Sequence, residues 1–142
     1  MFFIFTNINA HADIICGSIE GFEFSNGNKS INLIDGRTYL SNDLPEDFFI
    51  SLNVDGYSQS VRYTVENLDT GEIFKITERV EPYTFPAGNS KWNLGNGTFR
   101  VKATLYKFDL GFGKCDSKTI TFSVYEECPA DAGTLTASSS TV

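Results

Sequence analysis

Apolar and polar residues alternate along most of the chain with the two-residue period of a half-buried β-strand. The pattern is most regular over 97–106, where the apolar positions are Phe99, Val101, Ala103 and Leu105. Similar segments or short apolar runs lie at 19–24, 31–34, 38–40, 48–54, 60–65, 73–76 and 118–125. No window of about eleven residues carries the period of an amphipathic helix. The pattern therefore predicts an all-β protein.

Turn-forming residues separate these segments. Asn-Gly or Asp-Gly pairs, which support the positive φ of tight turns, occur at 26–27, 35–36, 55–56 and 96–97. About seven or eight short strands at a spacing of roughly ten residues are typical of a β-sandwich. The clean alternation indicates antiparallel sheets with one face toward the core and one toward water.

The chain has 142 residues, which is enough for one domain with its own core. We assign residues 16–127 to this domain. Residues 1–15 contain an apolar start and the small-x-small triplet 10–12, so they are interpreted as a signal-peptide remnant or an N-terminal tail. Residues 128–142 are mostly small and polar, and are interpreted as a linker or the start of a following module, with a disordered tail as the alternative.

The net charge argues against nucleic acids and anionic membranes as partners. It is −7, and the eleven Lys and Arg residues are scattered singly along the chain. Nucleic-acid binding needs clustered basic residues, so no nucleic-acid partner is predicted. An anionic membrane surface is disfavoured for the same reason. No run of eighteen apolar residues occurs, so no transmembrane segment is predicted.

Candidate catalytic chemistry is sparse. His11 is the only histidine and lies outside the predicted domain, which excludes a Cys–His or Ser–His pair within it. The three cysteines form no CxxC motif, so no metal site and no cofactor are predicted. Two carboxylates could serve a glycosidase, but no distinctive spacing singles out a pair. The sequence therefore favours a protein that is not an enzyme.

Residues 97–103, Gly-Thr-Phe-Arg-Val-Lys-Ala, resemble the Gly-x-Tyr-x-Val-x-Ala pattern of strand F in immunoglobulin and fibronectin type III domains. Phe99 occupies the tyrosine position, so the hydrogen bond of a tyrosine corner cannot form. Further short motifs follow a characteristic order along the chain, at 21–24, 35–36, 44–45, 60–63, 81–83, Trp92 and 119–124.

Together these motifs resemble the Ig-like (cadherin-like) repeats of large secreted adhesins and polysaccharide-associated proteins of Bacteroidetes and marine bacteria. The resemblance covers residues 19–125. It implies an immunoglobulin-like antiparallel β-sandwich in a secreted or cell-surface, multidomain protein. It does not identify a ligand.

The positions of the cysteines suggest a disulfide. Cys16 precedes the first predicted strand and Cys115 precedes the last, and in this topology the two lie at the same end of the sandwich. A bridge that closes such a long loop adds ~4–5 kcal/mol of stability in the chain-entropy model. Two free thiols are the alternative. If Cys16 and Cys115 form the bridge, Cys128 would pair with a cysteine outside this sequence.

Aromatic residues are the candidate ligand contacts. Trp92 with Tyr83 and Phe85 could form a platform for sugar rings, although a lone Trp in a sandwich also commonly fills the core. Phe108 and Phe112, with Leu110 between them, alternate in a glycine-rich loop and could mark a contact surface. The alternative is a hairpin that folds back on the sandwich.

Two functions follow from these observations. The first is a non-catalytic structural or adhesive module of an exported multidomain surface protein, with neighbouring modules and a surface glycan or protein as partners. The second is a carbohydrate-binding module attached to a polysaccharide-processing or adhesin protein. An exposed coplanar pair of aromatic rings would favour the second, and a buried Trp92 would oppose it.

Overall fold

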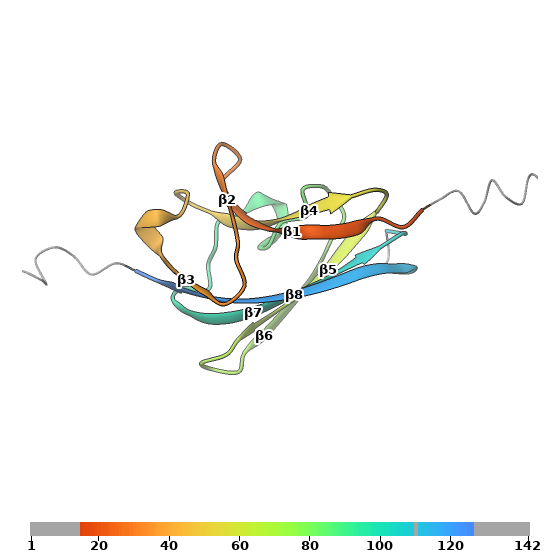
Figure 1. Ribbon diagram of the computed structural model, residues 1–142. Helices are drawn as coiled ribbons and strands as arrows, with labels where there is room; N and C mark the ends of the chain where they lie inside the picture. The colour runs from red at the N-terminus through yellow and green to blue at the C-terminus, as the bar shows by residue number, and fades with distance from the viewer. Residues whose placement is uncertain (1–14, 110, 127–142) are drawn as a thin grey trace, which may run out of the picture.

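The computed structural model describes residues 15–109 and 111–126, which form eight strands in two packed sheets (Figure 1). The smaller sheet has the order β2-β1-β4, with β1 at Ser18–Ser25, β2 at Ser30–Asn32 and β4 at Phe49–Asp55. The larger sheet has the order β3-β8-β7-β5-β6, and its strands are Arg37–Leu40, Lys114–Tyr125, Gly97–Tyr106, Ser60–Asn67 and Ile73–Glu78. Two single turns of 3₁₀ helix lie at Ser41–Asp43 and Ala87–Asn89. The predicted all-β sandwich is confirmed.

One strand pair departs from the antiparallel prediction. β3 lies parallel to β8, whereas the other pairs of named strands are antiparallel. After β2 the chain crosses from the smaller sheet to the edge of the larger one, where Asp35 Oδ1 accepts a 2.8 Å hydrogen bond from the Thr121 amide. A strand that arrives by a crossover is not held by a hairpin turn, so its direction can match that of its neighbour.

The core consists of the inward-facing side chains of both sheets. Phe24 on β1 is fully buried and makes edge-to-face contacts with Tyr39, Phe48 and Phe122, with ring centroids 5.0–5.2 Å apart. Such aromatic pairs add about 0.5–1.5 kcal/mol each beyond the area that they bury. The predicted inward positions of 97–106 are all buried, as the alternation indicated.

The strand β4 differs from its predicted one-sided pattern. Four successive residues, Phe49 to Leu52, are buried. The segment 82–85 runs along the free edge of β4, where Ile50 and Phe85 exchange two backbone hydrogen bonds of 2.8 Å. This irregular segment therefore covers an edge that would otherwise expose unpaired backbone groups.

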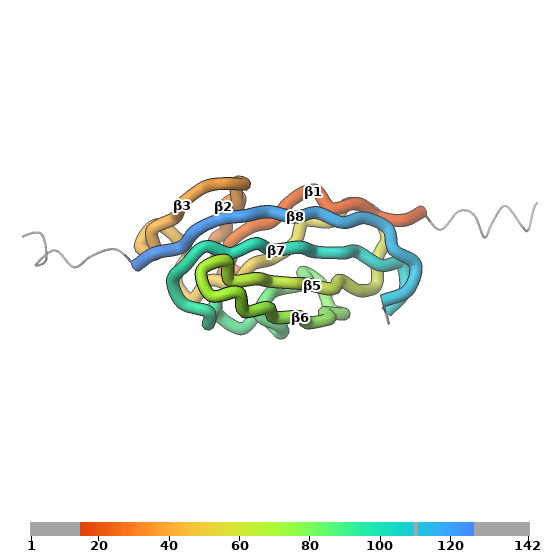
Figure 2. The backbone as a smooth tube through the Cα atoms, turned by 90° about the horizontal axis from the view of Figure 1, so that it is seen from below, coloured from red at the N-terminus to blue at the C-terminus, as the bar shows by residue number. Residues whose placement is uncertain are grey.

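The described chain enters and leaves at opposite ends of the sandwich. β8 runs the whole length of the larger sheet, from the end where β1 begins to the far end at Tyr125 (Figures 1 and 2). At about 3.3 Å per residue, the eleven steps from Cys115 to Glu126 span about 36 Å.

Candidate functional site

The three aromatic residues predicted as a sugar platform do not form one. Tyr83 and Phe85 are only 2% and 4% exposed, and their rings are unavailable for stacking on a ligand. Trp92 is half-buried and packs on the core, with its ring stacked on Phe48 and edge-on to Phe99 at a centroid distance of 4.9 Å. Its indole nitrogen donates a 3.0 Å hydrogen bond to the Gly95 carbonyl. These positions match the core interpretation of Trp92.

Two buried tyrosines hold the segment around Tyr83 in place. The Tyr63 hydroxyl donates to the Tyr83 carbonyl, and the Tyr83 hydroxyl lies 3.0 Å from Ser58 Oγ. Burial raises the pKa of Tyr63 well above its ordinary value. Burial also raises the pKa of Tyr83, and the hydrogen bond with Ser58 opposes part of that increase. Both phenols therefore stay protonated at neutral pH and serve as hydrogen-bonding groups.

The loop between β7 and β8 presents the other two predicted contact residues to solvent. Phe108 is 48% exposed and Phe112 is 64% exposed. The loop continues the hairpin, because the amides of Lys107 and Phe108 donate to the carbonyls of Gly113 and Phe112 at 2.8 and 3.1 Å. Leu110 lies outside the described residues. Neither described ring folds back into the core.

Side chains from neighbouring strands anchor this loop. Ser60 Oγ donates a 2.6 Å hydrogen bond to the Phe108 carbonyl, and Arg79 Nε donates to the Asp109 carbonyl at 3.0 Å. The Arg62 guanidinium lies over the Tyr106 ring at 5.4 Å, and a Cβ added at Gly111 would lie only 2.6 Å from its Nη2. The two phenylalanines are thus displayed from a loop that is tied to β5 and to the residue after β6.

The predicted disulfide between Cys16 and Cys115 is confirmed, with the two Cα atoms 5.1 Å apart. Cys115 lies inside β8 rather than before it, at a register shift opposite Leu105 and Tyr106. Cys128 lies outside the described residues. The disulfide fastens the start of the described chain to the beginning of the last strand.

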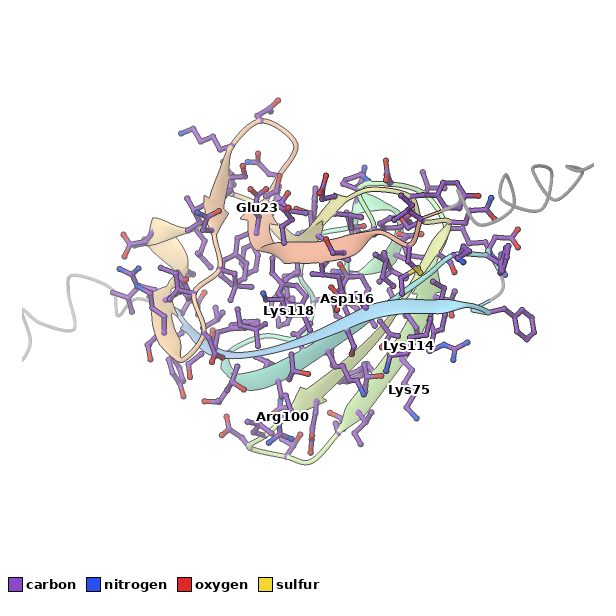
Figure 3. All side chains as sticks on the ribbon, turned by 45° about the vertical axis from the view of Figure 1, so that its right-hand side comes forward. Glu23, Lys75, Arg100, Lys114, Asp116 and Lys118 are labelled. Atoms are coloured by element: carbon purple, nitrogen blue, oxygen red, sulfur yellow. A yellow bond between two sulfur atoms is a disulfide. The ribbon has the colours of Figure 1, made fainter. Side chains whose placement is uncertain are left out.

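Asp116 reinforces the same junction. Its carboxylate accepts hydrogen bonds from the backbone amides of Ile19 on β1, at 2.7 Å, and of Ser117, at 2.8 Å. These two bonds stabilise the charged form and lower the pKa of Asp116 below its ordinary value. Figure 3 shows Asp116 between β8 and β1.

Sequence reasoning missed a cluster of basic residues on the larger sheet. Arg62, Lys75, Arg100 and Lys102 are exposed and lie on the outer face of β5, β6 and β7. In the sequence Arg62 and Lys75 are far from Arg100 and Lys102, which are two residues apart, and only their outward positions in the alternating pattern signalled their orientation. The strand register is what brings them together.

Within the described ranges 15–109 and 111–126, no three or more His, Cys, Asp or Glu side chains gather as a metal-binding group. No helix there is long and apolar enough to cross a bilayer. The chain matches no family model, no curated protein and no solved structure.

Proposed function

We propose that the chain is a non-catalytic structural or adhesive module, with an immunoglobulin-like sandwich, of an exported multidomain surface protein. The observation that carries this proposal is that the described part of the chain begins, near Cys16, and ends, near Tyr125, at opposite ends of the sandwich (Figures 1 and 2). Modules joined end to end form an extended array only if each one receives the chain at one end and releases it at the other. A module of this shape spaces or presents its neighbours.

The disulfide supports the exported setting. Disulfides persist in secreted and surface proteins and are rare in reducing compartments. The bond joins residues 99 positions apart, so it closes nearly the whole described fold into one loop. In the chain-entropy model such a loop adds about 4–5 kcal/mol to the free energy of unfolding.

The titratable groups support a non-catalytic role. In the described part of the chain, the groups with shifted pKa values are Tyr63, Tyr83 and Asp116, and all three make hydrogen bonds that hold the fold together. Active sites typically gather groups with perturbed pKa values around a cleft. The three groups here serve packing and strand fastening instead.

Surface exposure of the native protein tests the proposal. Antibodies raised against the folded chain should bind intact cells of the source organism. Thiol alkylation of the protein from those cells should find Cys16 and Cys115 protected until a reductant is added. Antibody binding only after lysis, together with two freely alkylated thiols, would contradict export.

The second candidate is a carbohydrate-binding module, and the exposed rings of Phe108 and Phe112 favour it. A glycan array probed with the full chain, with calcium and again with a chelator, tests this candidate. Binding should then be lost on Phe112→Ala and kept on Tyr125→Ala, which removes a 41% exposed ring at the opposite end of the sandwich. A folded protein that binds no glycan, or equal loss in both variants, would exclude this use of the loop.

A further inference from the structure

The outer face of the larger sheet carries four exposed basic residues in neighbouring rows. Lys75 on β6 pairs with Thr64 on β5, which pairs with Lys102 on β7. Arg62 and Arg100 belong to the flanking rows. We call Arg62, Lys75, Arg100 and Lys102 the basic face. In Figure 2 this side of the sheet faces the viewer, and no other described segment lies in front of β5 and β7.

The charge of this face is opposite to that of the whole chain. The chain carries −7, whereas the basic face has four cations and one neighbouring outward carboxylate, Glu66 on β5, which accepts a 2.8 Å hydrogen bond from Arg100. The strands of the smaller sheet contain Glu20, Glu23 and Asp55 and no Lys or Arg. Figure 3 shows Glu23 on one side of the sandwich and Lys75 and Arg100 on the other. The sandwich therefore presents a positive face to an anionic partner.

Hydroxyl groups surround these cations. The outward positions beside them are occupied mainly by threonine and serine: Thr64, Thr77, Ser117, Thr119 and Thr121. Thr104 on the same face is buried, and Ile73 is its exposed apolar residue. The outward aromatic residue nearest to the face is Tyr106, and the Arg62 guanidinium covers its ring. Charges and hydroxyls on a flat surface suit a ligand that has many hydroxyls and regularly spaced anionic groups.

The spacing of the cations favours a polysaccharide over a nucleic acid. Lys75 and Lys102 are two strands apart, or about 10 Å, and Arg100 and Lys102 are about 7 Å apart along β7. Duplex DNA carries a charge every ~1.7 Å along its axis, which is far denser than this face. Single-stranded nucleic acids are generally held by stacking on exposed aromatic rings, and the strand positions paired with Lys75 and Lys102 carry none.

We propose that the basic face binds a linear acidic polysaccharide, whose carboxylate or sulfate groups contact Arg62, Lys75 and Lys102 and whose hydroxyls contact the surrounding threonines. This inference names the class of ligand that the adhesive module binds, and it therefore rests on the proposed adhesive function. The basic face adjoins the aromatic loop at Arg62, which lies beside Gly111. Lys75 on β6 and Lys102 on β7 belong to the face alone, so mutation of these two lysines separates the two binding ideas.

Binding of the full chain to defined polymers tests the inference. The probes are alginate for carboxylates, chondroitin sulfate for sulfates, dextran as the neutral polymer and a single-stranded DNA oligomer. The wild-type chain should bind at least one acidic polysaccharide, more weakly as salt rises, and should not bind dextran. The relative binding of alginate and chondroitin sulfate identifies the preferred anionic group.

Matched charge reversals locate the surface. Lys75→Glu/Lys102→Glu should weaken binding at least ~10-fold, because it turns attraction into repulsion at the centre of the face. Lys29→Glu/Lys91→Glu makes the same change in net charge at exposed positions outside the larger sheet and should change binding less than ~2-fold. If the first variant does not fold, Lys75→Gln/Lys102→Gln provides a milder test of the same positions.

Several outcomes would overturn the inference. They are no binding to either acidic polysaccharide, equal losses in both charge-reversed variants, and tighter binding to the DNA oligomer. Self-association that the Lys75→Glu/Lys102→Glu variant abolishes would assign the face to a second copy instead. None of these results changes the outcome of antibody binding to intact cells, which tests the proposed function. Failure of this inference and failure of the proposed function are therefore distinguishable.

Discussion

The disulfide between Cys16 and Cys115 joins the start of the described chain to the beginning of β8, the strand that leaves the sandwich at its other end. Tension applied through the two chain ends therefore passes from Cys16 directly to Cys115 and then along β8. The residues between the two cysteines lie in a covalently closed loop outside this path. A single strand, already extended, carries the load.

This load path predicts an almost inextensible module. When the oxidised chain is pulled from its ends, unfolding should release less than about 1 nm, because β8 is already close to its full extension. With the disulfide reduced, residues 16–126 become extensible and should release roughly 35 nm. Single-molecule force spectroscopy of the chain between marker domains measures both lengths.

The oxidised and reduced samples both carry Cys128→Ser, so that Cys16 and Cys115 are their only cysteines. Adding Cys16→Ser/Cys115→Ser to this variant removes the disulfide without chemical reduction. A release of tens of nanometres from the oxidised chain would show that the load does not pass through the disulfide.

Asp116 should make stability depend on acid pH. The pKa of Asp116 in the folded protein lies below that of an unfolded Asp, which is near 3.9. The contribution of Asp116 to the free energy of unfolding is therefore complete above about pH 3.9, and it is lost as the pH falls through the folded pKa. Asp116→Asn should lower the free energy of unfolding at pH 7 by about 0.5–1 kcal/mol, a modest figure because the carboxylate is partly solvated. Urea unfolding at pH 7 and near pH 2 should show this difference shrinking in acid. A difference that stays constant between these pH values would contradict the assignment.

Gly111→Ala should loosen the loop that carries Phe112. The residue has a φ of +80°, and its new Cβ would lie 2.6 Å from Arg62 Nη2, so the flexible Arg62 side chain would have to move from its place over Tyr106. The backbone strain and the lost Arg62 contact together should cost about 1–2 kcal/mol. Gly36→Ala is the matched control, because Gly36 has a φ of +82° and no atom within 4 Å of an added Cβ. Urea unfolding should find the larger loss in Gly111→Ala, and equal losses would rule out the Arg62 contact as a cause.

Trp92→Ala should destabilise the sandwich by about 2–4 kcal/mol, because it opens a cavity beside Phe48, Phe85 and Phe99. Trp92→Phe keeps part of that volume and should cost less. Thermal unfolding followed by circular dichroism compares the two variants with the wild type. Loss of ligand binding at unchanged stability would instead indicate that the ring contacts a ligand.

The alternating pattern by itself determined most of the strands. The segment predicted at 97–106 is β7, and its inward residues are the buried ones. The positions of Cys16 and Cys115 before the first and last predicted strands, combined with the expected sandwich topology, suggested their disulfide, with two free thiols as the alternative. The strands were predictable because the period of a strand and the chemistry of its turns are encoded within a few neighbouring residues.

The tertiary structure decided what depends on pairing between distant segments. The parallel direction of β3, the burial of Tyr83 and Phe85 along the edge of β4, and the gathering of Arg62, Lys75 and Lys102 on one face all follow from strand order and register. An outward lysine has the same local pattern whether its neighbour across the sheet is acidic, basic or neutral. Non-local pairing leaves no signal in the period of a single strand, so the basic face became visible only once the strands were aligned.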